Sequence, residues 1–317
     1  MNKKYDNLDE YKMAVLSDCI KSTDIMKKIT LPQSVYKYRR FDAQYLKESL
    51  DGNVFFSNPI DMNVNDPYDC KMKFDTKKIL KTMFPEISSE ICKKHPEILQ
   101  ELERYKKSLQ GTLRVGCFTT CDCSQIEMWD NPYFGDKHKG YCIKYRVEQE
   151  YFYPGTIVFL KVLYDNNGFD ATDSMKNFVE WVKLQEKGMG NTRCYQEKSA
   201  KLVCLGHNHT LFKPEKYKGE DEWRIIIPEN RYVEYFGKKD VFTNDFSHLM
   251  QAVYLGSEFR NTDKNGEMYE YALGVCKRLH IPLYIMQQNG DKLKEKIEYS
   301  PDEKLRISVV LKAEILK

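Results

Sequence analysis

The stretch Lys218-Gly-Glu-Asp-Glu-Trp-Arg-Ile-Ile-Ile-Pro228 leads from an acidic loop into a run of three isoleucines. A β-branched run that ends at a proline is typical of a short strand buried on both faces, so we expect a central strand here. Side chains alternate along a strand, which puts Glu220, Glu222 and Arg224 on one side of its entrance. We therefore expect Glu222 to pair with Arg224 while Glu220 stays near the mouth of a site.

Two neighbouring carboxylates allow two interpretations. They raise each other's pKa, which suits an acid/base pair or a pair that stabilises a cation. The simpler interpretation is a solvated strand end that carries a salt bridge. The rest of the sequence has to decide between them.

Composition excludes several classes of protein. The chain has 317 residues, enough for one elaborate domain, which we favour over two smaller ones. Its 50 basic and 47 acidic residues leave a net charge of +3, so the totals give no strongly basic nucleic-acid footprint. The first residues lack an apolar signal region, and no apolar stretch approaches the ~18 residues of a membrane span. We expect a cytoplasmic protein without a membrane partner.

Ten cysteines raise the question of disulfides or zinc. They are scattered, and neither the group Cys117, Cys121 and Cys123 nor the stretch from Cys204 to His209 has paired C-x-x-C spacing. We expect free thiols and no metal.

The order of apolar patterns predicts an α+β fold with a mixed sheet and helical insertions. Residues 1–30 are expected to form an amphipathic N-terminal helix, residues 31–260 the core, and residues 261–317 a C-terminal helix and strands packed on it. A helical insertion is expected at about 75–110. Asp42 should cap a helix through Leu50, and Ser124 a short helix through Asp130. Strands are expected over Val35–Tyr38, Val54–Pro59, Leu113–Phe118, Tyr141–Tyr145, Thr156–Tyr164, Ala252–Gly256, Leu283–Met286, Lys294–Tyr299 and Leu305–Leu311.

Four stretches together resemble a bacterial family known as domain of unknown function 2971. They are Tyr36-Lys-Tyr-Arg39, Phe56-Ser-Asn-Pro59 with Asn65-Asp-Pro-Tyr-Asp-Cys70, Met128-Trp129 with His138-Lys-Gly-Tyr-Cys-Ile143, and Glu220-Asp-Glu-Trp-Arg224. The likeness extends from about Leu31 to Gly256. That family is in turn distantly similar to ADP-ribosyltransferases, which split NAD and transfer ADP-ribose.

The resemblance implies an ADP-ribosyltransferase-like core and roles for particular residues. Arginine-type transferases carry an Arg on the first core strand, a Ser on the second and a Glu-x-Glu pair before a later strand. Arg39, Ser57, Glu220 and Glu222 occur here in that order, although Ser57-Asn-Pro stands where the transferases have Ser-Thr-Ser. Glu222 would stabilise the ribosyl cation, Glu220 would act on the acceptor, Arg39 would bind the NAD phosphates, and Ser57 would fix Glu222.

Further candidates complete the expected NAD site. Aromatic side chains could stack on nicotinamide, and the full candidate set is Tyr38, Asp66, Tyr68, Trp129, Tyr133, His138 and Arg224. Several of these have a structural interpretation: Trp129 as a core aromatic, Asp66 as a loop brace, and His138 as a solvated turn residue. Whether Arg39 or Arg40 faces the site stays open.

Three functions compete at this point. The first is an NAD-dependent ADP-ribosyltransferase, an effector of bacterial toxin–antitoxin or antiphage systems that modifies a protein or a nucleic acid and has an antitoxin or another defence protein as partner. The second is a metal-dependent nuclease or phosphoesterase that uses Asp66, Asp69, Glu220 and Glu222. The third is a non-catalytic module that binds a nucleotide.

Overall fold

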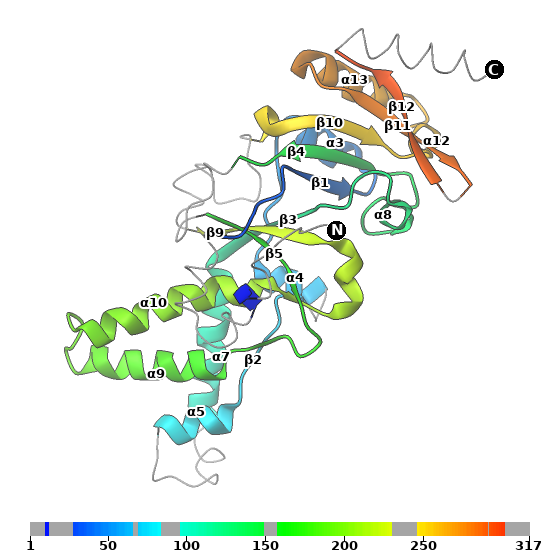
Figure 1. The fold of residues 1–317 in the computed structure, drawn as a ribbon. Coiled ribbons are helices and arrows are strands. Elements are labelled where there is room, and N and C mark those ends of the chain that lie inside the picture. Colours follow the sequence, from blue (N-terminus) through cyan, green and yellow to red (C-terminus); the bar gives the residue numbers. More distant parts are fainter. Residues whose placement is uncertain are drawn as a thin grey trace.

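The computed structural model describes residues 10–12, 28–65, 69–83, 96–148, 157–229, 246–290 and 292–301. The fold belongs to the α+β class and is organised by one eight-stranded mixed sheet (Figure 1). β10 and β11 run parallel, and the other neighbouring strands of the sheet run antiparallel. The strand order is β12 (Lys292–Tyr299), β11 (Leu283–Asn289), β10 (Met250–Leu255), β4 (Tyr141–Arg146), β1 (Ser34–Arg39), β3 (Leu113–Thr119), β9 (Glu222–Pro228) and β5 (Val158–Lys161).

The isoleucine run forms a doubly paired strand, as its composition predicts. β9 lies between β3 and β5, with Ile226 opposite Val115 on one side and Val158 on the other. Ile226 and Ile227 are completely buried. Because the strand is hydrogen-bonded along both edges, its acidic entrance at Glu222 has a fixed position in the sheet.

The predicted cap at Asp42 is confirmed. Its side chain accepts a hydrogen bond of 2.9 Å from the backbone N–H of Tyr45 and so starts helix α3 (Ala43–Leu50). This helix packs against α13 (Glu267–Leu279), near the end of the sheet that carries β10 to β12 (Figure 1). The short helix α12 (Phe259–Thr262) precedes α13.

The strand predicted over Val54–Pro59 is wrong. Val54 and Phe56 are buried as expected, but pairing is limited to Ser57, which exchanges two backbone hydrogen bonds of 2.8 Å with Val115. The side chain of Asn58 then accepts from the N–H of Ile60 at 2.8 Å and begins helix α4 (Pro59–Asn65) at once. The local capping geometry therefore ends the extended segment after a single bridge.

A helical layer lies beyond the β5 side of the sheet (Figure 1). The predicted insertion at about 75–110 contributes helices α5 and α7, and helix α9 packs against both α5 and α10. Tyr105 on α7 stacks on Phe178 of α9 with ring centroids 3.4 Å apart. The insertion is thus part of a larger helical group. Its members are α5 (Thr76–Met83), α7 (Pro96–Gly111), α9 (Thr172–Glu186) and α10 (Arg193–Asn208).

Two small parallel pairings connect this layer to the sheet. The strand predicted over Thr156–Tyr164 is interrupted at Val162, so that β5 is followed by a separate strand β6 (Leu163–Tyr164). β6 pairs with β8 (Phe212–Lys213), which brings Lys213 to the entrance of β9. β2 (Met72–Lys73) pairs with β7 (Phe169–Asp170) in the same way.

Helix α8 (Ile126–Asp130) forms as predicted, but its cap differs. The helix begins after Gln125 without a side-chain cap, because the Ser124 hydroxyl donates instead to Asp122 at 2.6 Å. The predicted cap at Ser124 is therefore wrong.

Parts of the predicted architecture lie outside the described residues. Of the N-terminal helix, the structure describes a helical turn at residues 10–12, and the strand predicted at Leu305–Leu311 is not described. In the described part of the chain, no helix combines the length and the apolar character that a membrane span requires.

Candidate functional site

A pocket of about 300 Å³ opens where β1, β3 and the entrance of β9 come together. This size is at the lower end of the range of small-molecule sites. Of the eleven predicted site residues, six line the pocket: Tyr38, Arg39, Ser57, Tyr133, Glu220 and Glu222. Asp66 and Tyr68 lie outside the described residues. Trp129, His138 and Arg224 do not line it.

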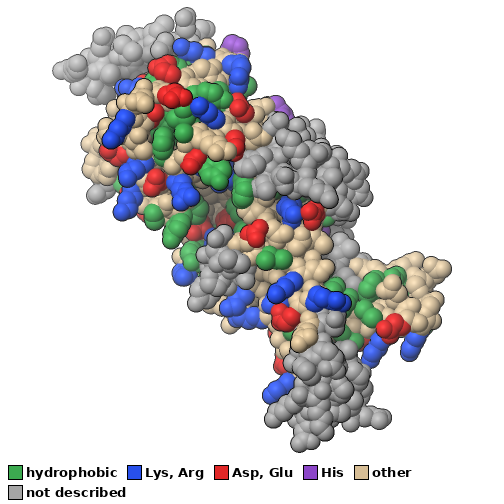
Figure 2. Space-filling view, turned by 180° about the vertical axis from the view of Figure 1, so that it is seen from behind, with side chains coloured by type: hydrophobic (Ala, Val, Ile, Leu, Met, Phe, Trp, Pro, Cys, Tyr) green, Lys and Arg blue, Asp and Glu red, His purple; other side chains and the backbone are tan. Residues whose placement is uncertain are grey.

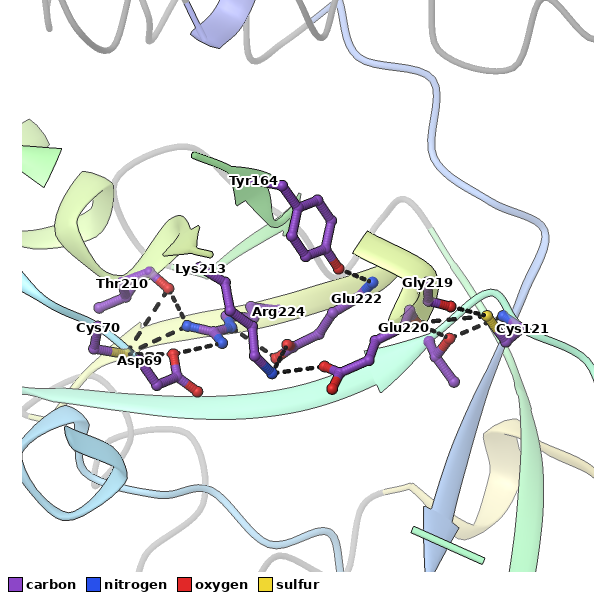
Figure 3. A network of polar contacts seen from close by, with 11 residues as sticks. Asp69, Cys70, Cys121, Tyr164, Thr210, Lys213, Gly219, Glu220, Glu222 and Arg224 are labelled. Atoms are coloured by element: carbon purple, nitrogen blue, oxygen red, sulfur yellow. Dashed lines mark hydrogen bonds and ion pairs between the residues drawn. The ribbon is translucent and has the colours of Figure 1, made fainter. Parts of the chain in front are cut away.

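One half of the pocket is an ion-paired acidic cluster (Figure 3). The ammonium of Lys213 lies 2.6 Å from a Glu220 oxygen and 3.0 Å from Glu222 Oε2. The guanidinium of Arg224 donates from Nε to Glu222 Oε1 at 2.8 Å and from Nη2 to Asp69 Oδ1 at 2.7 Å. Each carboxylate of this acidic half therefore has a cation as its neighbour.

The expected pairing of Glu222 with Arg224 is confirmed, and Arg224 does not line the pocket. The Arg224 side chain is completely buried, and its Nη1 donates to the backbone oxygen of Thr210 and to Cys70 Sγ, the latter at 3.3 Å. The Arg224 guanidinium therefore donates its hydrogen bonds to groups in the protein interior. Arg224 thus positions Glu222 from behind and does not reach the cavity.

The two carboxylates of the motif differ in their pKa. Burial would raise the pKa of Glu222, but Arg224 and Lys213 outweigh burial and hold it well below its usual range. Burial raises the pKa of Glu220 above its usual value, and the attraction of Lys213 does not cancel that effect. The expectation that the pair would raise both pKa values is therefore wrong for Glu222. The pair combines a fixed anion with a more basic carboxylate.

A short helix delivers the acidic motif to the pocket. η3 (Glu215–Glu220) ends at Asp221, whose φ of 43° lies in the left-handed region. The Asp221 side chain is held by the hydroxyl of Thr120. The Tyr164 hydroxyl accepts from the backbone N–H of Glu222 at 2.9 Å. These contacts turn the chain between Glu220 and Glu222 so that both side chains reach Lys213.

Ser57 lies in the pocket wall but does not hold Glu222. Among the described residues, the Glu222 carboxylate is held by Arg224 and Lys213, and Ser57 makes its bonds to Val115 through its backbone. The expected contact of Ser57 with Glu222 is therefore wrong. Ser57 contributes to the site as a lining residue of the cavity.

The other half of the pocket is basic. Lys37 and Arg39 are two residues apart on β1, so their side chains leave the same face of the strand, and both line the cavity. The Arg39 side chain lies over the Phe55 ring, 5.5 Å from its centroid, and the guanidinium has no hydrogen bond or ion pair with any residue that the structure describes. Arg40 is exposed and is not part of the lining. Arg39 is therefore the arginine of this strand that faces the site.

Lys37 is a site residue that the sequence did not single out. Its Nζ donates to the backbone oxygen of Cys117 at 2.7 Å and lies 4.8 Å from the centroid of the Phe118 ring. Burial, followed by the nearby charge of Arg39, lowers the pKa of Lys37 to about 7. A lysine two residues before the candidate arginine on a strand is the signal that could have identified it. Lys213 carried no comparable signal, because β8 is only two residues long.

The aromatic candidates separate into a rim residue and structural residues. Tyr133 is 84% exposed and stands at the rim of the pocket. Tyr38 lines the cavity, but its hydroxyl donates to the backbone oxygen of Asp122 at 2.7 Å. Among the described aromatic candidates, Tyr133 is thus the side chain most accessible to a ligand.

Trp129 and His138 do not line the pocket. Trp129 is completely buried, and its Nε1 donates to the backbone oxygen of Cys123 at 3.0 Å. The His138 ring is buried, with Nε2 2.8 Å from Asp130 Oδ1. The His138 backbone packs so tightly against Gly256 that a side chain at position 256 would overlap it. Trp129 lies in α8, His138 lies in the turn after it, and both side chains have structural contacts there.

The described cysteines and acidic residues form no recognisable metal site. The seven cysteines whose side chains are described are free thiols: Cys70, Cys117, Cys121, Cys123, Cys142, Cys194 and Cys276. Within the described ranges, no group of three or more His, Cys, Asp or Glu side chains has an arrangement that could hold a metal ion.

Comparisons with protein-family models, with curated proteins and with solved structures found no match for this chain. A functional assignment therefore has to rest on the geometry and the charges of the pocket.

Proposed function

We propose that the protein is an NAD-dependent ADP-ribosyltransferase that works in this pocket. The observation that carries the proposal is the meeting of Arg39, Ser57, Glu220 and Glu222, from three distant parts of the chain, in the lining of one cavity. These are the four positions that the resemblance to ADP-ribosyltransferases singled out from the sequence.

Glu222 suits the charge that develops when NAD is split. The bond between ribose C1′ and the nicotinamide nitrogen breaks, its electron pair leaves with nicotinamide, and the ribose carbon becomes cationic. Because Arg224 and Lys213 hold the pKa of Glu222 low, the carboxylate is charged at neutral pH. The same two contacts, 2.8 and 3.0 Å long, fix its position before substrate binds. A preorganised charge of this kind is the most effective way to stabilise a cationic transition state.

Glu220 suits the second half of the reaction. Burial makes its carboxylate more basic than an ordinary glutamate, although Lys213 lies 2.6 Å away. A carboxylate with a raised pKa is a better acceptor for the proton that leaves the acceptor nucleophile as that nucleophile bonds to C1′. Glu220 is therefore assigned to the acceptor and Glu222 to the ribosyl cation.

Arg39 and Tyr133 provide for the remainder of the dinucleotide. The Arg39 guanidinium, without an ion pair in the described part of the chain, can bind a phosphate in a bidentate manner. The exposed ring of Tyr133 at the rim can stack on an aromatic base. A cavity of about 300 Å³ takes the nicotinamide and ribose end of NAD, with the rest of the molecule along the opening.

The biological setting belongs to the same proposal. The resemblance to the bacterial family suggests an effector of a toxin–antitoxin or antiphage system, with a protein or nucleic-acid acceptor and an antitoxin or another defence protein as partner. Acidic and basic side chains are interspersed on the face that Figure 2 shows. The described part of that face therefore offers no broad basic surface to an acceptor.

The nuclease alternative draws less support from the geometry. Metal-dependent phosphate chemistry needs carboxylate oxygens that are available to a cation. Here Arg224 pairs with Asp69 at 2.7 Å and Lys213 pairs with Glu220 at 2.6 Å. Two of the four acids that this alternative uses are therefore held by cations of the chain, and Asp66 lies outside the described residues. The binding-module alternative stays open to the same experiment.

The decisive experiment is incubation of the protein with NAD, with and without Mg²⁺, and mass detection of nicotinamide and ADP-ribose. We expect nicotinamide release without Mg²⁺. Glu222→Gln should lower the rate by about two to three orders of magnitude, because one such electrostatic group contributes ~3–4 kcal/mol. Glu220→Gln should reduce transfer to an acceptor more than hydrolysis.

Glu215→Gln is the matched control, because Glu215 lies on the same short helix η3 as Glu220, is partly exposed and does not line the pocket. Circular dichroism should show that each variant is folded. A folded Glu222→Gln variant as active as the parent would remove Glu222 from the mechanism. If neither the parent nor any variant releases nicotinamide, the binding module would be favoured.

A further inference from the structure

The basic half of the pocket contains a group that the proposed reaction does not use. Lys37 lies in the cavity lining beside Arg39, yet neither residue pairs with a carboxylate of the described chain. Three acidic side chains, Asp69, Glu220 and Glu222, line the same cavity, but their cationic partners are Lys213 and Arg224. Among the described residues, the acidic cluster therefore leaves Lys37 without a counterion.

The contacts of Lys37 include no carboxylate of the described chain and are compatible with a neutral amine. One of its N–H groups donates to the backbone oxygen of Cys117 at 2.7 Å, a bond that a neutral amine makes while keeping its lone pair. Its neighbours include the Phe118 ring, 4.8 Å away. The ionisable groups that act on it are Arg39 on β1, Cys117 on β3 and Glu222 on β9.

We infer that Lys37 is the nucleophilic amine of the pocket and condenses with an aldehyde ligand whose anionic group is bound by Arg39. This inference is independent of the proposed transfer of ADP-ribose. It concerns a different ligand class, a small phosphorylated or carboxylated aldehyde, for which a cavity of about 300 Å³ is large enough.

The reaction needs no further reactant. The lone pair of Lys37 Nζ attacks the carbonyl carbon, and the carbonyl oxygen takes up one amine hydrogen to give a carbinolamine. The C–O bond then breaks, the second amine hydrogen leaves with that oxygen as water, and a C=N bond remains. Burial, followed by Arg39, lowers the pKa of Lys37 to about 7, so a large share of this amine is neutral at pH 7.4. For an ordinary lysine the neutral fraction is about one in a thousand.

The same pocket holds an internal control. Burial would lower the pKa of Lys213, but Glu222 and Asp69 outweigh burial and raise it, so this amine stays protonated. Lys218, with 74% of its side chain exposed, is the accessible reference amine. Selectivity for Lys37 over both lysines is what the inference requires.

The experiment uses pyridoxal 5′-phosphate as a probe aldehyde, with brief exposure of the full chain at pH 7, reduction by borohydride, and peptide mass spectrometry. We expect the labelled fraction of Lys37 to exceed that of Lys218 and of Lys213 at least tenfold. Labelling of Lys37 should rise with pH around 7 and level off above 8. Equal labelling of Lys37 and Lys218 on the same parent molecules would overturn the inference, and this competition does not depend on any variant.

Two variants test the parts of the site separately. Lys37→Arg keeps a long basic side chain that cannot form the imine, so it should remove the selective label. Arg39→Gln should slow labelling by pyridoxal 5′-phosphate at least fivefold and leave labelling by unphosphorylated pyridoxal within twofold. If both aldehydes lose reactivity equally, or neither does, Arg39 is not the anion anchor.

Discussion

The two lysines of the pocket, Lys37 and Lys213, differ in pKa because different groups surround their amines. Lys213 lies 2.6 and 3.0 Å from two carboxylates, whereas Lys37 lies 2.7 Å from a neutral carbonyl oxygen. Lys213 is buried and Lys37 is partly buried, yet the pKa of Lys213 is raised and that of Lys37 falls to about 7. Burial acts in the same direction on both, so the difference comes from their neighbours.

The comparison divides the site into a locked half and an available half. In the locked half, Arg224 and Lys213 pair with Asp69, Glu220 and Glu222, and these ion pairs fix the positions of the three carboxylates. In the available half, Lys37 and Arg39 have no carboxylate partner in the described chain and can receive an anion. Substitutions in each half test this division, from the largest expected effect to the smallest.

Removal of Arg224 should break the locked half. Arg224→Met takes away a completely buried guanidinium and leaves Glu222 and Asp69 buried with less compensation. We expect a loss of about 3–5 kcal/mol in the free energy of unfolding, measured by urea denaturation. Arg193→Ala, at an arginine whose side chain is 91% exposed, should change it by no more than about 0.5 kcal/mol. Equal effects of the two variants would show that the buried network contributes little.

The pH dependence of stability should separate the two lysines. The folded pKa of Lys37 is lowered to about 7, so between pH 7 and about 10.4 the unfolded state binds the extra proton and stability rises with pH. We therefore expect the difference in unfolding free energy between the parent and Lys37→Met to increase by roughly 1–2 kcal/mol from pH 7 to pH 9. Without solvent screening, the increase would approach ~1.4 kcal/mol for each pH unit.

Lys213→Met is the matched control for that titration. The folded pKa of Lys213 is raised, so its contribution is fully present below the unfolded pKa and disappears only at higher pH. The difference between the parent and Lys213→Met should stay constant from pH 7 to 9. A flat curve for Lys37→Met as well would contradict the contrast between the two halves.

The smallest expected effect concerns Tyr38, which lines the pocket next to Lys37. Tyr38→Phe removes the hydrogen bond of 2.7 Å to the Asp122 carbonyl oxygen and should cost about 0.5–1.5 kcal/mol of stability by thermal denaturation. Tyr133→Phe, at a tyrosine that is 84% exposed, should have an effect below about 0.5 kcal/mol. A cost that is no larger for Tyr38→Phe than for Tyr133→Phe would mean that the hydroxyl of Tyr38 has no structural role.

Local patterns predicted the features that depend on neighbouring residues. The isoleucine run forms a doubly paired strand, Asp42 caps its helix, and Glu222 pairs with Arg224 two positions along the same strand. Each depends on contacts within a few residues or on a regular period.

The errors concern contacts between distant segments. Lys213 reaches Glu222 because β6 pairs with β8. A strand of two residues has no sequence pattern that would predict this pairing. Trp129 was a candidate for stacking on a ligand, but its indole fills the core and donates to the Cys123 carbonyl oxygen. An aromatic side chain on a short helix has the same local signature in both environments, so only the packing of that helix distinguishes them.

The most direct test of the proposed site is the affinity for NAD of the parent and of two neighbouring arginine variants, measured by isothermal titration calorimetry. Arg39 lines the pocket and Arg40 beside it is exposed, so the pair controls for charge. We expect Arg39→Gln to weaken NAD binding by roughly tenfold or more, since a charged hydrogen bond contributes ~1.5–3 kcal/mol. Arg40→Gln should stay within about twofold of the parent. Absence of NAD binding by the parent, or equal losses in both variants, would contradict it.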